Sequence, residues 1–278
     1  YSFEQLGRRG QCFSFTFNYT PKINTEELEP KKEEVLLDEN FSFDILPSAD
    51  EEILEAIKCI YASYGYQYFH QHLYSVESFK KDVKGNTYVP IICKNEHKQV
   101  MCYCALDENQ WFKGIPEFSN LVTKPLARGK KLATRIFTKT EEVAKNLSYE
   151  GIHVSAVAYH PYTQKLCNKF NYTPCAIEYA INPPDTIGPT TPGRSSCVLC
   201  VKIFNKQKKH TIFVSEECKN MVNSIFKSEE LNYEINTTGI NLLTDSSIDY
   251  VIDSDTNNCF IKIDSCGEEF EKDIGIIC

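Results

Sequence analysis

The residues best suited to chemistry are four basic side chains at the junction between a predicted strand and a predicted helix. Residues 124–146 read KPLARGKKLATRIFTKTEEVAKN, with Lys124, Arg128, Lys130 and Lys131 close together. The amphipathic pattern of a helix begins among them. Cations there oppose the helix dipole, which favours acidic side chains in the first turn. Free backbone N–H groups and basic side chains together suit a phosphate or pyrophosphate. The stretch therefore predicts an anion-binding site.

The absence of nucleotide-binding motifs, the net charge and the lengths of the apolar runs argue against several classes of ligand and partner. The chain lacks the G-x-x-x-x-G-K-[ST] motif of a nucleotide P-loop and the G-x-G-x-x-G motif of a dinucleotide site. Its net charge of −8 and isoelectric point near 5.4 argue against a nucleic-acid partner. No run approaches the ~20 apolar residues of a membrane span, so we expect no membrane partner.

The thirteen cysteines raise the question of disulfides or zinc. The nearest pairs, Cys102/Cys104 and Cys197/Cys200, lie in apolar, strand-like runs and not in the turn-rich knuckles of zinc sites. The number is odd and the spacing does not repeat. We therefore expect buried free thiols, no metal site and a reducing, cytoplasmic compartment.

The elements that must position the basic stretch form an α/β pattern. Between residues 41 and 205 the order is β-α-α-β-β-β-α-β-α-β-β, which predicts a mixed sheet. A strand is expected over 41–47, a helix over 51–63 with Asp50 as its N-cap, and a helix over 129–146. The last helix buries one apolar stripe: Leu132, Ala133, Ile136, Phe137, Thr140, Val143 and Ala144.

Four parts are expected along the chain: a terminal hairpin (1–20), a charged linker (21–40), the α/β domain (41–205) and a partial second α/β domain (206–278). The last part should hold a helix near 215–228 and strands at 248–252 and 259–264. Because the chain starts with Tyr1 and stops in an apolar run, we expect it to be a piece of a longer protein.

Several features together resemble the GNAT acyltransferases. Residues 128–133, RGKKLA, match the family's pyrophosphate loop, Arg/Gln-x-x-Gly-x-Gly/Ala. EFSNLVTKP stands where the family's central strand precedes that loop, and HPYTQKLCNKFNYTP resembles its later helix. The resemblance implies a mixed, largely antiparallel central sheet flanked by helices, with acetyl-CoA as cosubstrate. A nucleotide-phosphate binder would explain the basic helix start but not the later helix or the strand order.

The resemblance assigns the coenzyme A contacts. The pyrophosphate falls to the backbone amides of Arg128, Gly129, Lys130, Lys131, Leu132 and Ala133. The pantetheine arm falls to the preceding strand at Leu121, Val122 and Thr123. His160 replaces the asparagine of the later helix and is included with these cofactor-binding residues.

Two departures from the family pattern concern glycines. Lys131 stands at the usual loop glycine, so its side chain must point away from the phosphates or pair with them. Asn171 replaces the glycine of Lys-Leu-Gly-Phe, and asparagine tolerates the left-handed backbone conformation that such a glycine adopts.

The resemblance also suggests catalytic groups. Glu117 lies where a carboxylate often acts as general base, taking a proton from the attacking amine. The alternative is a solvated carboxylate at a strand start. Cys167 lies where the family commonly has a tyrosine that reprotonates the coenzyme A thiolate. A thiol can donate a proton, yet a buried helix cysteine is the alternative.

The acceptor pocket is expected beside the first helices, in YGYQYFHQHLY. Tyr66, Tyr68 and His70 are its candidate substrate-binding residues; alternatively the aromatic cluster caps the sheet. The predicted function is transfer of an acetyl group from acetyl-CoA to a primary amine of a small molecule or protein. The alternative is a non-catalytic acyl-CoA sensor in a multidomain protein. A closer resemblance is to GNAT modules fused behind a histidine-kinase-like ATPase domain of the anti-sigma-factor type, which implies an attached ATPase-like domain.

Overall fold

The computed structural model describes residues 40–272, apart from residues 48, 86, 109–112, 185–192, 208, 215, 217, 238–244, 254–257, 266, 268, 269 and 271. The hairpin predicted over 1–20 lies outside the described residues. So does the linker predicted over 21–40, except Asn40. The predicted attached ATPase-like domain is not tested by the structure.

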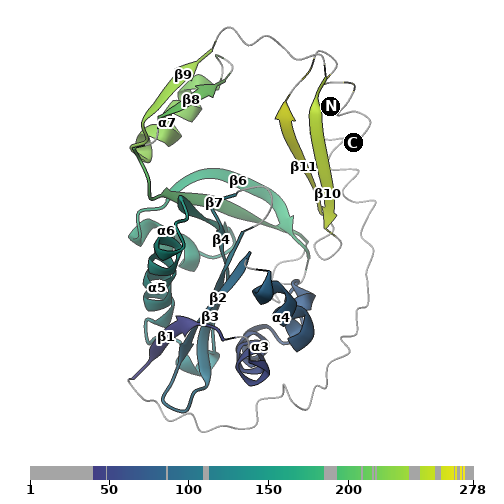
Figure 1. The fold of residues 1–278 in the computed structure, drawn as a ribbon, viewed down its shortest axis with the longest axis vertical. Helices are drawn as coiled ribbons and strands as arrows, with labels where there is room; N and C mark the ends of the chain where they lie inside the picture. The colour runs from purple at the N-terminus through teal and green to yellow at the C-terminus, as the bar shows by residue number, and fades with distance from the viewer. Residues whose placement is uncertain are drawn as a thin grey trace.

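A seven-stranded sheet forms the centre of the molecule (Figure 1). Its order is β1-β2-β3-β4-β5-β7-β6, and every neighbouring pair is antiparallel except β4 and β5. The strands are β1 (Ser42–Ile45), β2 (Tyr88–Lys94), β3 (Val100–Asp107), β4 (Glu117–Thr123), β5 (Gly151–Val157), β6 (Thr173–Asn182) and β7 (Ser195–Ile203). The predicted mixed, largely antiparallel sheet is confirmed.

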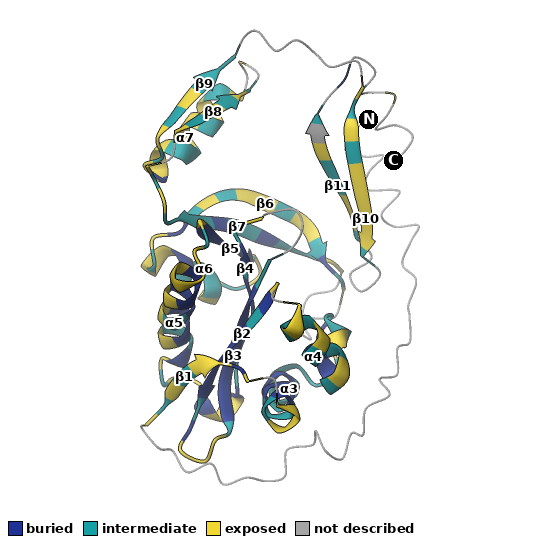
Figure 2. Cartoon of the chain, viewed as in Figure 1, coloured by how far each residue is buried: buried dark blue, intermediate teal, exposed yellow. Residues whose placement is uncertain are grey.

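Helices cover both faces of this sheet, and each face has its own core (Figure 2). On one face lie α3 (Asp50–Tyr64), the short 3-10 helix η2 (Gln71–Tyr74) and α4 (Val76–Lys84). The opposite face packs against α5 (Leu132–Asn146) and α6 (Tyr162–Lys169). The core between the sheet and α3/α4 contains Ile57, Phe79 and Tyr103, whereas that between the sheet and α5/α6 contains Phe118 and Phe137.

The element order predicted for 41–205 is confirmed, with shifts at the helix ends. Helix α5 begins at Leu132 and not near Gly129, because a 3-10 turn, η3 (Pro125–Ala127), and a loop come first. Its predicted stripe is buried except for Ala133, which is partly exposed. The N-cap of α3 is Ala49, so Asp50 is the first helical residue and not the cap.

After residue 205 the elements are β8 (His210–Phe213), α7 (Lys219–Ser228), β9 (Tyr233–Asn236), β10 (Ser247–Asp253) and β11 (Asn258–Ser265). The helix and the last two strands were predicted; the parallel pair β8–β9 was not. Hydrogen bonds join this part to the main sheet. The Glu229 carboxylate accepts from the Ile203 backbone N–H at 3.2 Å, and the Asn258 amide donates to the Ile181 carbonyl at 2.7 Å.

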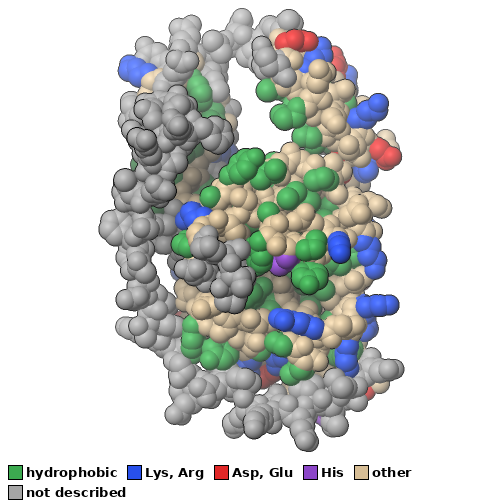
Figure 3. Space-filling view, turned by 180° about the vertical axis from the view of Figure 1, so that it is seen from behind, with side chains coloured by type: hydrophobic (Ala, Val, Ile, Leu, Met, Phe, Trp, Pro, Cys, Tyr) green, Lys and Arg blue, Asp and Glu red, His purple; other side chains and the backbone are tan. Residues whose placement is uncertain are grey.

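All ten described cysteines are free thiols, and seven of them are buried, as predicted. Among the described residues, no group of His, Cys, Asp or Glu side chains is arranged to hold a metal ion. None of the helices in the described part of the chain is long and apolar enough to cross a membrane. On the face opposite the viewpoint of Figure 1, hydrophobic side chains gather in the middle and basic ones lie mostly along one margin (Figure 3).

Candidate active site

The sheet is nearly divided between its two parallel strands. β4 and β5 pair at one position only, Glu117 opposite His153, where the His153 backbone N–H donates to the Pro116 carbonyl at 3.1 Å. Beyond this point β4 and β5 do not pair with each other in the described part of the chain, so the backbone groups on their facing edges are not bonded to a neighbouring strand. Such an edge is available to an extended ligand.

A β-bulge in β4 accompanies the divergence. Tyr103 pairs with Val122 but Ala105 pairs with Ser119, so one residue of β3 opposes two of β4. Asn120, in the bulge, has a φ of 58°, in the left-handed region that asparagine tolerates better than most residues.

The Asn120 side chain belongs to a buried polar chain. Its amide nitrogen donates to the Tyr88 hydroxyl at 2.7 Å, and its carbonyl oxygen accepts from Tyr68. The Tyr88 hydroxyl also bonds that of Tyr103. This chain ties the bulge to β2, β3 and the segment that follows α3. Asn120 was not predicted as a site residue, although an asparagine inside a strand pattern is the signal that could have found it.

The three residues predicted to hold a pantetheine arm face different directions. The Lys124 N–H donates to the Met101 carbonyl at 3.0 Å, which fixes the hydrogen-bonding alternation of β4. Val122 therefore directs its backbone groups to β3, whereas Leu121 and Thr123 direct theirs into the gap. The Thr123 carbonyl already accepts from the Ser63 hydroxyl at 3.2 Å and from Arg128 Nε at 3.4 Å.

The loop after β4 presents a row of free backbone donors. No recorded hydrogen bond within the described part of the chain uses the backbone N–H groups of residues 129–134. Lys131, the N-cap of α5, makes no side-chain cap and has a φ of 60°. Gly129 has a φ of 83°, and a Cβ placed there would meet no atom within 4 Å. The exposed donors at the positive end of α5 are suited to an anion.

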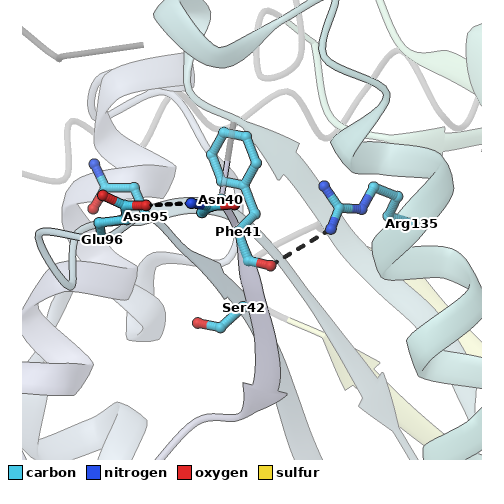
Figure 4. Close-up of a pocket in the computed structure, with 6 residues that line it drawn as sticks. All are labelled: Asn40, Phe41, Ser42, Asn95, Glu96 and Arg135. Carbon is cyan, nitrogen blue, oxygen red and sulfur yellow. Dashed lines mark hydrogen bonds between the residues drawn. The ribbon is translucent and has the colours of Figure 1, made fainter. Parts of the chain in front are cut away.

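Basic side chains around this loop contact the start of β1. Lys130 Nζ lies 5.5 Å from the centre of the Phe41 ring, and the Arg135 guanidinium carbon lies 4.7 Å from that of Phe43. Beside them is a pocket of about 340 Å³. Figure 4 shows Phe41 between Arg135 on one side and Asn95 and Glu96 on the other. The pocket lining carries both signs of charge, so it is less suited to an anion than the loop.

Glu117 occupies the point where β4 and β5 separate. The Ser155 hydroxyl and backbone N–H, across the gap on β5, donate to its carboxylate. The pKa of Glu117 is raised from 4.5 to about 8, mainly by burial; the charges of Asp107 and Glu178 also raise it, whereas the hydrogen bonds from Ser155 lower it. A carboxylate with a pKa near neutrality is suited to accept and release a proton.

Two further carboxylates lie on the same face as Glu117. Asp107 is its cross-strand partner on β3, and burial raises the pKa of Asp107 to about 6. Burial also raises the pKa of Glu178 on β6, whose carboxylate accepts from the Ser155 hydroxyl. The sequence analysis missed both, because residues on separate strands become neighbours only in the folded sheet. A lone glutamate in the apolar run AIEYAI was the available signal for Glu178.

Cys167 lies on the other side of the sheet. It is 1% exposed and packs in the core beneath α5 and α6. A hydrogen bond with Cys200 and burial raise the pKa of the Cys167 thiol far above its usual range. This placement favours the alternative of a buried structural cysteine over the predicted proton donor.

His160 lies in the bend between β5 and α6. Its ring contacts those of Tyr159 and Tyr162, with centroids 4.7 and 5.1 Å away. Its Nδ1 atom is buried and has no hydrogen-bond partner among the described residues. The nearby Gln164 amide donates to the Val157 carbonyl at 3.0 Å, which closes the end of β5. His160 therefore lies at the β5 side of the gap.

Of the three candidate acceptor residues, Tyr68 bonds β4 directly. Tyr68 is buried, stacks on Tyr64 with centroids 4.8 Å apart, and donates to Asn120. Tyr66 packs edge-on against Tyr61, with ring centroids 4.9 Å apart. Burial, and then the neighbouring His72, lower the pKa of His70 to about 3, so His70 is neutral at pH 7.

The site can be compared with known proteins. No protein-family model matches the sequence, and no curated protein matches it. Among solved structures, a provisionally assigned acetyltransferase from Acinetobacter baylyi ADP1 is 14% identical, with a TM-score of 0.50 over 59% of this chain and 93% of that one.

Two further structures are similar. An N-acetyltransferase from Staphylococcus aureus Mu50 is 13% identical, with a TM-score of 0.47 over 59% of this chain and 98% of that one. A provisionally assigned acetyltransferase from Salmonella typhimurium, solved with its cofactor acetyl-CoA, is 11% identical, with a TM-score of 0.48 over 61% of this chain and 96% of that one. At these identities the likeness concerns the fold alone, which is the GNAT fold.

Proposed function

We propose that the chain is an acyl-CoA-dependent N-acyltransferase that transfers an acetyl group to a primary amine, with Glu117 as general base. The observation that carries the proposal is Glu117 itself. Its carboxyl group, with a pKa raised to about 8, lies where β4 and β5 separate, on the strand that leads to the free donors of the α5 loop.

The backbone groups of the α5 loop and of the β4 edge that follow Glu117 along the chain suit coenzyme A. The N–H groups of residues 129–134 would hold the pyrophosphate, and the positive φ of Gly129 and Lys131 directs these donors outward. Leu121 and Thr123 would bond the amides of the pantetheine arm along the free edge of β4. Lys131 and Arg128 are exposed and supply positive charge without obstructing the loop.

Acetyl-CoA would supply an acyl thioester, whose carbonyl carbon is attacked by the amine as the C–S bond breaks. The residues of this chain bring the reactants together and handle the amine proton. An amine beside Glu117 must lose one proton to become a nucleophile and another as the new C–N bond forms. Glu117 would take that proton, directly or through one water, and Ser155 would orient the carboxylate.

The alternative function, an acyl-CoA sensor without catalysis, has one observation in its favour. Cys167 is buried in the α5/α6 core and makes a poor proton donor for the leaving thiolate. A sensor would keep the loop and the β4 edge but would not use Glu117.

Calorimetric titration with acetyl-CoA and coenzyme A, followed by a thiol-release assay with a panel of amines, separates these functions. We expect binding of both ligands and release with at least one amine, with kcat/KM rising up to about pH 8 as Glu117 ionises. Glu117→Gln should keep the affinity for acetyl-CoA and lower kcat by ~10²–10⁴-fold. Binding without release from any amine would favour the sensor. No binding would refute both functions.

A further inference from the structure

The three carboxylates of the site, Asp107, Glu117 and Glu178, lie on one face of the sheet. Phe118, Leu106 and Val154 point into the core beneath α5. Because side chains alternate along a strand, Glu117, Asp107 and Ser155 point to the opposite face. The row of polar side chains continues to Glu178, which lies further along the sheet: Val157, two residues beyond Ser155, is opposite Cys197, and Cys197 is opposite Glu178.

Ser119 gives an independent sign of a ligand at this row. It is opposite Ala105, a member of the α3/α4 core, and therefore faces the same side as Glu117, two residues earlier. Ser119 is 8% exposed, and its hydroxyl oxygen is buried with no hydrogen-bond partner among the described residues. A buried hydroxyl without a partner is costly unless a ligand or water completes it.

When Glu117 and Glu178 are ionised, the row has more acceptors than donors. Ser155 has a single hydroxyl proton, yet its hydroxyl is the donor that both Glu117 and Glu178 use. Glu178 Oε2 is buried and accepts no hydrogen bond from the part of the chain that the structure describes. An ammonium group has three donors and no acceptor, so it would supply what this site lacks.

The charges near the row are also unbalanced. Within the described residues, no Lys or Arg forms an ion pair with Asp107, Glu117 or Glu178. His72, which acts electrostatically on Asp107, lies 3.6 Å from another carboxylate, that of Asp82. A cleft lined with charges of one sign concentrates ligands of the other sign.

We propose that the acceptor is an amine with a second positive charge, of the class of short aliphatic diamines, with the reacting nitrogen beside Glu117 and Ser119 and the second ammonium on Glu178. This inference rests on the proposed function. Glu178 is the suitable partner because it shares a face of the sheet with Glu117, its charge acts on Glu117, and Ser155 interacts with both carboxylates. Asp107, on the other side of Glu117, adds to the negative field.

The test compares 1,4-diaminobutane with 1-aminobutane, which lacks only the second amine. Calorimetry in the presence of coenzyme A should give at least tenfold tighter binding of the diamine at low salt. Glu178→Gln should remove this preference. Glu142→Gln, a matched change at an exposed carboxylate of α5, should retain it. Ser119→Ala should weaken the binding of both amines.

Salt provides a second measurement that needs no variant. The preference of the unmodified protein for the diamine should shrink as ionic strength rises, because screening weakens attraction between partly exposed charges. Equal affinity for the two amines, no binding of either, or a preference that survives Glu178→Gln would overturn the inference.

The thiol-release assay distinguishes this inference from the proposed function. If both amines are acetylated equally well, the N-acyltransferase proposal holds and the diamine inference is wrong. If the diamine binds selectively but neither amine releases the coenzyme A thiol, the cation site is supported and acyl transfer is refuted.

Discussion

Glu117→Gln should change how stability depends on pH. Below pH 4.5 the carboxyl is protonated in the folded and unfolded chains alike. Between pH 4.5 and about 8 it is protonated only in the folded chain, because its folded pKa is raised. The folded state then binds more protons, so the free energy of unfolding falls as pH rises through this window. Above about pH 8 the carboxyl is ionised in both states, so the free energy of unfolding falls no further on its account. A glutamine at this position does not titrate.

The unfolded-chain pKa of 4.5 and the folded-chain pKa of about 8 set an upper limit on this change in the free energy of unfolding. At 1.36 kcal/mol per pH unit, the interval corresponds to about 4.8 kcal/mol. Glu117 keeps part of its surface in solvent, and screening reduces the energy, so we expect about 2–4 kcal/mol. The stability of Glu117→Gln relative to the unmodified protein should therefore increase by that amount between pH 5 and pH 8.5.

Urea denaturation at half-unit steps from pH 5 to pH 9 measures this difference directly. Glu142→Gln, at an exposed carboxylate in an ion pair with Lys139, is the matched control and should follow the unmodified protein closely. If the curves of Glu117→Gln and the unmodified protein run parallel over the whole range, Glu117 has an ordinary pKa. The argument for a general base tuned by burial would then fail.

Three further substitutions test the loop and the core. Lys131→Gly should raise the free energy of unfolding by about 0.5–1 kcal/mol in urea titrations, because glycine adopts the left-handed conformation without strain; lower stability would contradict this. Gly129→Val should weaken coenzyme A binding at least tenfold by calorimetry and cost about 1–3 kcal/mol, since its φ of 83° strains a branched residue; unchanged affinity would place the pyrophosphate elsewhere. Cys167→Ala should cost about 1–2 kcal/mol in thermal denaturation through a small cavity and leave kcat within twofold; a large loss of kcat at unchanged KM would restore its role as proton donor.

Much of the fold could be predicted because its signals are local. The apolar stripe of α5 and the alternation of the strands specify which faces are buried, and short connections fix the order. The start of α5 was placed too early because Gly129 and Lys131 adopt positive φ values in a loop, and helical spacing does not reveal this. Strands β8 and β9, with four residues each, are too short for a clear alternation pattern.

The site was harder to predict than the fold. The position of Glu117 was suggested by a resemblance, but its raised pKa depends on burial in the folded sheet and on Asp107 and Glu178, which lie on other strands. The structure also separates residues that the sequence grouped together. Tyr68 reaches β4 through Asn120, whereas Cys167 lies beneath the opposite face. Spacing along the chain cannot report which face of a sheet a residue occupies once a bulge has changed the alternation.

The single pairing between β4 and β5 also affects how the domain folds. β1–β4 and the helices between them come from residues 42–123, and β5–β7 come from residues 151–203, so each half-sheet forms from contacts local in sequence. Helix α5 contacts strands of both halves and holds them together. A ligand that forms hydrogen bonds with Leu121 and Thr123 at the edge of β4 would also help to hold the two half-sheets together. Amide hydrogen exchange at these two residues should then be fast in the free protein and slow in the complex, reporting on how firmly the halves are joined.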